Sequence, residues 1–323
     1  MTEKIKNENI EIAATAVSDT HSGDYPTQQT EEITPQSPMD APTSQSSKQN
    51  LKWVDVVIVV MLFFVSQIVG GTITSAIGIR LPGEAYTTSF DADVLELADA
   101  MQSRFVAFSF LFSMVFCFIG LALYKWIRHW PRIVKLHTPL WSFPLRLLIG
   151  YFVMWAVSIS IEPLAALLPG DQEMLGGGGW LLFSAVILAP IFEETIFRGY
   201  VAGILRSLYG GLTAWLVSAI LFGAAHLIPS VIVSATACGL VLGFYYLRFR
   251  SLLMVIILHA MNNLTACFLR AIDMEDVTLR SAVDNDIAYW GIYSVCLIVS
   301  IVSFIRMARV MARTKSDKTT NNM

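Results

Sequence analysis

Long apolar runs recur along the chain after residue 50, and each could cross about 30 Å of hydrocarbon as a helix. They lie near 54–77, 105–124, 147–167, 180–200, 212–228, 231–247, 252–270 and 287–308. This pattern predicts an all-α, polytopic membrane protein with about eight transmembrane helices. Pro229 lies in the short interval 227–230 between the fifth and sixth runs, so we expect those two helices to form a tight hairpin broken at this proline.

Polar segments flank this apolar region and define the domain organisation. Residues 1–50 are rich in Ser, Thr, Gln and Pro, which predicts a disordered tail. Residues 51–312 form the predicted transmembrane helical domain, and 313–323 form a short second tail. The whole chain is 55% hydrophobic and only 15% charged, which fits a membrane protein and not a soluble domain. No basic run indicates a nucleic-acid partner, so the expected partner outside the site is the lipid bilayer.

Charged residues alternate between the two sets of loops and predict the orientation of the chain. The loop after the second run carries only basic charges, and a basic cluster follows the last run: Lys125, Arg128, Arg132, Lys135 and Arg146, then Arg306, Arg309, Arg313, Lys315 and Lys318. The loop after the first run is mostly acidic, with Glu84, Asp91, Asp93, Glu96 and Asp99. Because basic loops stay in the cytoplasm, we expect an integral membrane protein, in the cell membrane if bacterial, with both termini cytoplasmic.

A pair of adjacent carboxylates lies within the fourth apolar run, followed by an arginine. An ionised side chain at the bilayer centre costs roughly 2.5–3.5 kcal/mol on insertion scales, so these charges need a reason to be there. Glu194 and Arg198 are four residues apart on one helical face, in the favourable order for an ion pair. Glu193 points about 100° away and is predicted to face a cavity, where burial would make it a usable general base.

Two further apolar runs each carry a histidine with a partner four residues away. Phe222 precedes His226 on one predicted helical face, where the ring can orient the imidazole. His259 precedes Asn263, and this spacing aims an imidazole and a carboxamide at one developing oxyanion. Asn262 lies off this face, so we interpret it as a residue that joins two helices.

Together these side chains predict one site for peptide hydrolysis by activated water. A carboxylate and an imidazole can position and deprotonate the water, while a second imidazole and an amide stabilise the tetrahedral oxyanion. No serine or cysteine nucleophile is required. Two other classes of protein could use the same buried groups: an ion-coupled transporter with a Glu/His relay, and a non-enzymatic immunity or scaffold protein.

The three motifs Glu-Glu-x-x-x-Arg, Phe-x-x-x-His and His-x-x-x-Asn, in this order over about 180–270, resemble those of the CPBP family of CAAX proteases and bacteriocin-processing (Abi) enzymes. That family includes the type II CAAX prenyl endopeptidases. The resemblance implies an intramembrane endopeptidase, acting on a prenylated or a bacteriocin-like substrate at the membrane. It implies that Glu193 and His226 activate water and that His259 and Asn263 form the oxyanion hole. Glu194, Arg198 and Phe222 would support them.

Two questions stay open at this level. Members of the family are commonly called metalloendopeptidases, and Glu193, His226 and His259 could supply three ligands of a zinc ion, although the same atoms suit a metal-free glutamate protease. The helix boundaries also offset Glu193 from His226 by about 10 Å along the membrane normal, Glu193 being nearer the cytoplasm. A break at Pro190 or a shift of the helices would remove this offset, so we expect a shared site near or just cytoplasmic of the midplane.

Overall fold

The computed structural model describes residues 51–83, 91–130, 143–169, 177–272, 274 and 277–314. These residues belong to one compact unit, Lys48–Met323. The predicted tail at 1–50 and nearly all of the predicted tail at 313–323 lie outside the described residues.

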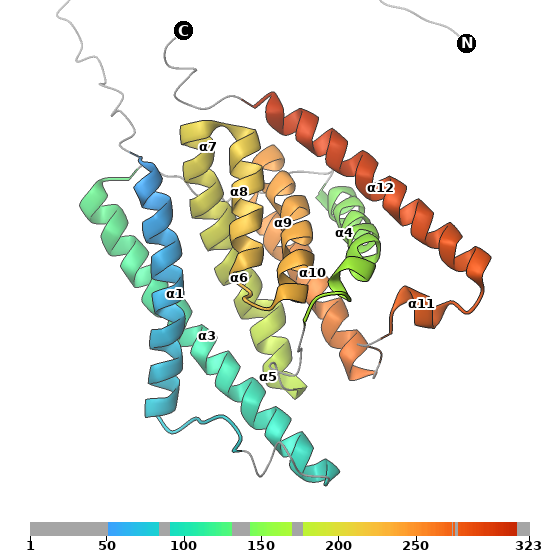
Figure 1. Ribbon diagram of the computed structural model, residues 1–323. Coiled ribbons are helices and arrows are strands. Elements are labelled where there is room, and N and C mark those ends of the chain that lie inside the picture. Colours follow the sequence, from blue (N-terminus) through green and yellow to red (C-terminus); the bar gives the residue numbers. More distant parts are fainter. Residues whose placement is uncertain are drawn as a thin grey trace, which may run out of the picture. The chain divides into compact units, whose positions relative to one another are not determined.

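The described part of the chain is helical and contains no strand, which confirms the all-α prediction (Figure 1). Each of the eight predicted apolar runs corresponds to a helix or to a continuous series of helical segments. The elements are α1 (Trp53–Ala76), α3 (Ala92–Arg128), α4 (Phe143–Ala165), a helical series from α5 to α7 (Gly178–Tyr209), α8 (Gly211–Ala224), α9 (Pro229–Phe249), α10 (Leu252–Ala271), the short α11 (Leu279–Ala282) and α12 (Asp286–Ala312).

Among the described residues, seven helices or helical series are long and apolar enough to cross a membrane, and of the eight predicted runs only the one that forms α8 falls short. Its 14 residues extend about 21 Å, which is less than the roughly 30 Å of a hydrocarbon core. The sequence predicted this helix to continue to residue 228, which is wrong.

The turn between α8 and α9 contains His226, which therefore lies beyond the helix and not on its last turn. Leu227 adopts a positive φ of 63°, a conformation that ends a helix and reverses the chain. The sequence placed Pro229 in the break between the two helices. Pro229 is instead the first residue of α9. Proline suits this position because its missing N–H would have no helical partner there and its φ is already helical. The predicted hairpin of α8 and α9 is confirmed.

The series from Gly178 to Tyr209 departs from regular α-helix on both sides of Pro190. It consists of α5 (Gly178–Leu182), a π-helical segment η2 (Phe183–Leu188), α6 (Ala189–Glu193), a second π-helical segment η3 (Glu194–Ala202) and α7 (Gly203–Tyr209). It packs against α1 and α3 on one side and against α8 and α10 on another. Half of its most apolar stretch is buried, compared with about a fifth for α3 and α4. The two carboxylates are therefore held on a central helix.

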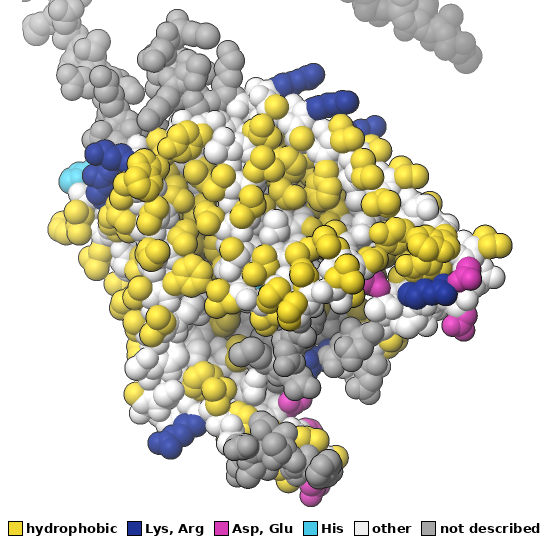
Figure 2. Space-filling view, in the orientation of Figure 1, with side chains coloured by type: hydrophobic (Ala, Val, Ile, Leu, Met, Phe, Trp, Pro, Cys, Tyr) yellow, Lys and Arg dark blue, Asp and Glu magenta, His cyan; other side chains and the backbone are white. Residues whose placement is uncertain are grey.

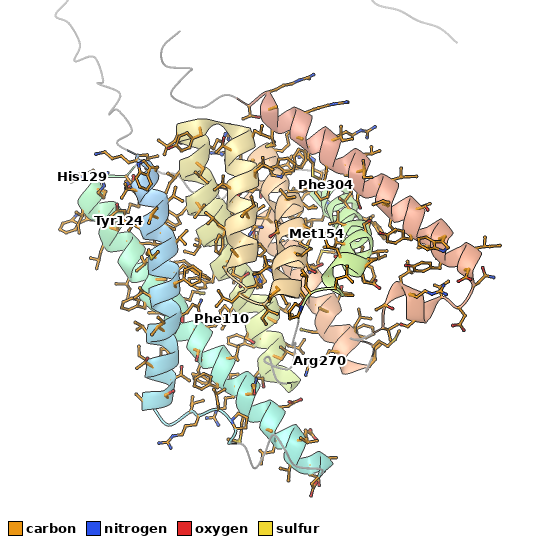
Figure 3. All side chains as sticks on the ribbon, viewed as in Figure 1. Phe110, Tyr124, His129, Met154, Arg270 and Phe304 are labelled. Atoms are coloured by element: carbon orange, nitrogen blue, oxygen red, sulfur yellow. The ribbon has the colours of Figure 1, made fainter. Side chains whose placement is uncertain are left out.

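Helices α1 and α3 pair closely and are joined by a buried carboxylate. Asp55 accepts a hydrogen bond of 2.7 Å from the Tyr124 hydroxyl and lies 3.5 Å from the guanidinium of Arg128. Figure 3 labels Tyr124 near the upper end of α3. Phe63 of α1 stacks on Phe192 of α6, with ring centroids 5.3 Å apart. Helices α1 and α3 therefore pack together against the helical series that carries Glu193.

Hydrophobic side chains cover the middle of the face shown in Figure 2. Many of the visible lysine and arginine side chains lie along its upper edge and others lie at the lower left and the right, while the visible acidic side chains lie toward the lower and right-hand edges. In Figure 1 the start of α1 and the end of α12 both lie at the upper edge. Such a belt with charged rims is typical of a protein embedded in a bilayer.

Candidate active site

Glu194 and Arg198 form the buried ion pair that their spacing predicted. Their side chains are fully buried, and Nη1 of Arg198 lies 3.1 Å from Oε1 of Glu194. Nη2 of Arg198 donates a hydrogen bond of 3.3 Å to the carbonyl oxygen of Gly239, and the guanidinium lies 4.0 Å from the ring centroid of Phe222. The arginine is thus fixed by three separate helices. Its charge compensates that of Glu194.

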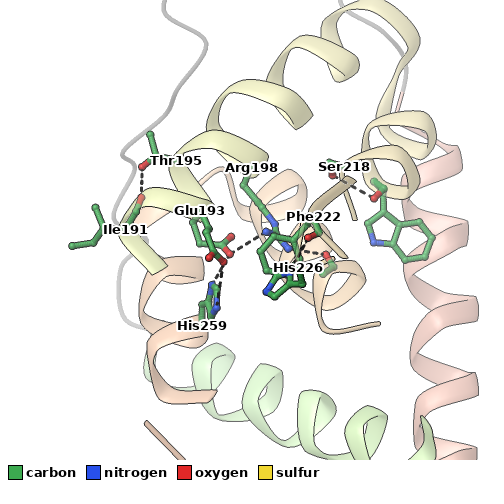
Figure 4. Close-up of polar contacts among 11 residues, drawn as sticks. Ile191, Glu193, Thr195, Arg198, Ser218, Phe222, His226 and His259 are labelled. Atoms are coloured by element: carbon green, nitrogen blue, oxygen red, sulfur yellow. Dashed lines mark hydrogen bonds and ion pairs between the residues drawn. The ribbon is translucent and has the colours of Figure 1, made fainter. Parts of the chain in front are cut away.

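His259 lies between the two carboxylates (Figure 4). Its Nδ1 is 2.9 Å from Oε1 of Glu194, and its Nε2 is 4.0 Å from Oε2 of Glu193. Glu194 thus contacts His259 in addition to the predicted partner, Arg198. Oε1 of Glu194 accepts from Arg198, which can only donate, and it accepts from His259 as well, so Nδ1 of His259 carries a hydrogen.

His226 is oriented by the end of the helix that precedes it. Its Nδ1 lies 3.0 Å from the carbonyl oxygen of Phe222, one of the carbonyls left without a helical donor at the end of α8. A carbonyl can only accept, so Nδ1 carries the hydrogen and Nε2 of the neutral ring is an acceptor. This tautomer is the one that a general base requires.

The Phe222 ring lies at the centre of the cluster. Its centroid is 5.1 Å from that of His226 and 5.8 Å from that of His259, both in edge-on geometry, and Phe197 packs on it at 5.5 Å. The predicted contact between Phe222 and His226 is confirmed. Continuous contacts therefore run from Glu193 through His259, Glu194, Arg198 and Phe222 to His226.

Asn263 is anchored to a different helix. Its Nδ2 donates a hydrogen bond of 2.8 Å to the carbonyl oxygen of Ala185 in η2. The interhelical bond that we expected of Asn262 is thus made by Asn263. One of the two amide hydrogens of Asn263 is used in this contact, which leaves the second for another acceptor.

Two contributors to the site were missed from the sequence. Gly239 accepts from Arg198, and an added Cβ there would lie 3.1 Å from Phe222. A glycine inside an apolar helix is a recognisable sign of close approach. Ala185 contributes only its carbonyl oxygen, and its side chain gives no signal.

No group of three or more His, Cys, Asp or Glu side chains that could hold a metal ion occurs within the described residues. Nδ1 of His226 and Nδ1 of His259 each face an acceptor, so Nε2 is the ring nitrogen that either histidine could offer to a metal. Glu193, His226 and His259 are not brought together as such a group here, and the zinc site stays a prediction. The chemistry proposed below uses no step through a metal.

Comparison with protein families gives a match over residues 176–265, to the family described as type II CAAX prenyl endopeptidase Rce1-like. This segment extends from just before α5 into α10 and contains all three motifs. Searches among curated proteins and among solved structures gave no match. The chain therefore contains an Rce1-like domain of the CAAX protease (CPBP) family within an all-α, polytopic membrane protein.

Proposed function

We propose that this protein is an intramembrane endopeptidase that hydrolyses a peptide bond of a membrane-associated polypeptide with an activated water. The observation that carries the proposal is the position of His259 between a neutralised carboxylate, Glu194, and a second carboxylate, Glu193. Glu193 keeps 12% of its side chain exposed, whereas the side chain of Glu194 is fully buried. We therefore assign Glu194 to the structural ion pair and Glu193 to the chemistry.

Glu193 and His226 are the proposed acid–base pair. Water that donates a hydrogen bond to Glu193 would lose its proton as it attacks the carbonyl carbon of the substrate. Nε2 of His226 is the acceptor nitrogen of its ring and can share this proton. The proton is then delivered to the nitrogen of the departing amine, so the site returns to its starting state.

His259 and Asn263 are the proposed oxyanion donors. Since Nδ1 of His259 already carries a hydrogen toward Glu194, a hydrogen on Nε2 makes the ring an imidazolium, and the two carboxylates beside it stabilise that charge. A charged donor in a site with little water stabilises a developing oxyanion more strongly than a neutral one. The second hydrogen on Nδ2 of Asn263 supplies the other donor.

The substrate and the orientation are part of the proposal. The family match supports a CAAX-type endopeptidase, and the resemblance implies either a prenylated protein or a bacteriocin-like peptide as substrate. Basic side chains at the end that holds the end of α12 support cytoplasmic termini. Because α8 ends at Ala224, before the predicted end of its run, the calculation that offset His226 from Glu193 by about 10 Å no longer applies, and a shared depth of the two residues is part of the proposal.

Comparative membrane proteomics of cells that carry the wild type or Glu193→Gln tests activity and identifies the substrate together. We expect at least one membrane-associated polypeptide to accumulate uncleaved with the variant, and the purified wild type in lipid nanodiscs to cleave it. Glu96→Gln is the matched control, because Glu96 is exposed on α3 and remote from the motifs. Cleavage by Glu193→Gln at the wild-type rate would refute the proposal.

The two other classes of protein, a scaffold or immunity protein and an ion-coupled transporter, predict different results for Glu193→Gln. A scaffold or immunity protein would still complement a deletion when it carries Glu193→Gln. An ion-coupled transporter would show proton-dependent solute flux in vesicles, which the substitution would abolish.

A further inference from the structure

The carboxamide of Asn263 is held by the backbone carbonyl of Ala185, a carbonyl whose usual helical donor bonds elsewhere. Ala185 and Asn263 are 78 residues apart, and the hydrogen bond between them joins η2 to α10. Inside an α-helix, a carbonyl oxygen accepts from the N–H four residues later. The carbonyl of Ala185 lacks this donor.

The local backbone shows how this donor is lost. The N–H of Ala189, four residues after Ala185, donates instead to the carbonyl of Ser184 in the π-helical pattern. In that pattern the donor for Ala185 would be the N–H of residue 190. This residue is Pro190, which has no N–H. Neither the α nor the π register supplies an N–H to the carbonyl of Ala185. Nδ2 of Asn263 donates to this carbonyl instead.

Given the proposed function, on which this inference rests, we propose that Pro190 is a positioning residue for Asn263. By withholding an N–H, Pro190 reserves the Ala185 carbonyl for the amide of Asn263. Since a carbonyl only accepts, Nδ2 and not Oδ1 must face Ala185, which fixes the flip of the amide. The second Nδ2 hydrogen is thereby held in one direction, and a preorganised donor is what oxyanion stabilisation requires.

Restoring an N–H at residue 190 should release Asn263. In Pro190→Ala, a π register gives the Ala185 carbonyl the N–H of residue 190, and a return to α register gives it that of Ala189. Either N–H would compete with Nδ2 of Asn263 for the carbonyl of Ala185. The affected step is oxyanion stabilisation, so the substitution should lower kcat and leave KM nearly unchanged.

The experiment measures kcat and KM for the full-length protein in nanodiscs, on the substrate found with Glu193→Gln. We expect Pro190→Ala to lower kcat by about tenfold or more, because loss of a whole oxyanion donor costs about 10²–10³. KM should stay within about twofold. Pro163→Ala is the matched control, since Pro163 is an exposed proline inside α4, and its kcat should match the wild type.

A double-mutant cycle separates positioning from a general structural effect. If Pro190 acts through Asn263, Pro190→Ala should add no further loss of kcat to Asn263→Ala. Losses that multiply would overturn the proposal. Pro190 is buried, so Pro190→Val provides a second variant that adds the same N–H with nearly the original side-chain volume, and it should show the same loss.

The outcomes also separate this inference from the proposed function. Activity of Glu193→Gln would defeat the proposed function itself. If Glu193→Gln is inactive while Pro190→Ala and Pro190→Val keep the wild-type kcat, the proposed function stands and the role of Pro190 is refuted.

Discussion

Nδ1 of His259 lies 2.9 Å from Oε1 of Glu194, and the same oxygen lies 3.1 Å from Nη1 of Arg198. One carboxylate oxygen thus orients an imidazole from α10 and neutralises a guanidinium from its own helix. The side chains of Glu194 and Arg198 are fully buried, and that of His259 is only 8% exposed. The contact makes the stability of the fold and the geometry of the proposed site depend on the same atoms.

Arg198→Ala should be strongly destabilising. The substitution leaves Glu194 as a buried charge with its arginine removed, which costs about 3–5 kcal/mol in the free energy of unfolding. We expect a clearly lower unfolding midpoint for the purified protein in detergent, with loss of cleavage. Arg280→Ala is the control, because Arg280 and Asp286 form an ion pair whose side chains are 54% and 73% exposed, and such pairs contribute about 0–1 kcal/mol. Equal midpoints for the two variants would contradict the buried pair.

Gly239→Ala should impair cleavage through Phe222. A Cβ at this position would lie 3.1 Å from Cδ1 of Phe222 and 3.3 Å from Nη2 of Arg198, so the ring that contacts both histidines must move. Overpacking of this kind costs about 1–3 kcal/mol. We expect a reduced kcat in a protein that still folds.

Gly71→Ala is the comparison for this variant, because Gly71 also lies inside a membrane helix and its added Cβ would meet nothing within 4 Å. It should cleave like the wild type. Wild-type kcat in Gly239→Ala would show that the position of Phe222 does not matter for cleavage.

Removal of metal ions tests the zinc prediction directly. Since no group of three or more His, Cys, Asp or Glu side chains that could hold a metal ion occurs in the described part of the chain, we expect cleavage to survive chelation and dialysis. Elemental analysis of the purified protein should find less than stoichiometric zinc. Cleavage that is lost on chelation and restored by added zinc would instead establish the metalloprotease mechanism.

Much of the fold could be predicted from the sequence because each membrane helix satisfies its own backbone and is recognisable by length and apolarity. The exceptions have local causes. α8 ends four residues early because Leu227 reverses the chain with a positive φ, and Pro229 starts α9. Leucine carries no sequence signal for that conformation, which glycine usually adopts.

The sequence by itself determined the helices, the buried carboxylate pair and the ion pair of Glu194 with Arg198, since an i,i+4 contact depends only on the helix that contains it. Only the tertiary structure decided that His259 contacts both carboxylates, that Asn263 binds the Ala185 carbonyl and that Phe222 lies between the histidines. These contacts join residues 65 and 78 positions apart in two of the cases. Their geometry depends on the depth and rotation of packed helices, and the periodicity of a single segment does not contain that information.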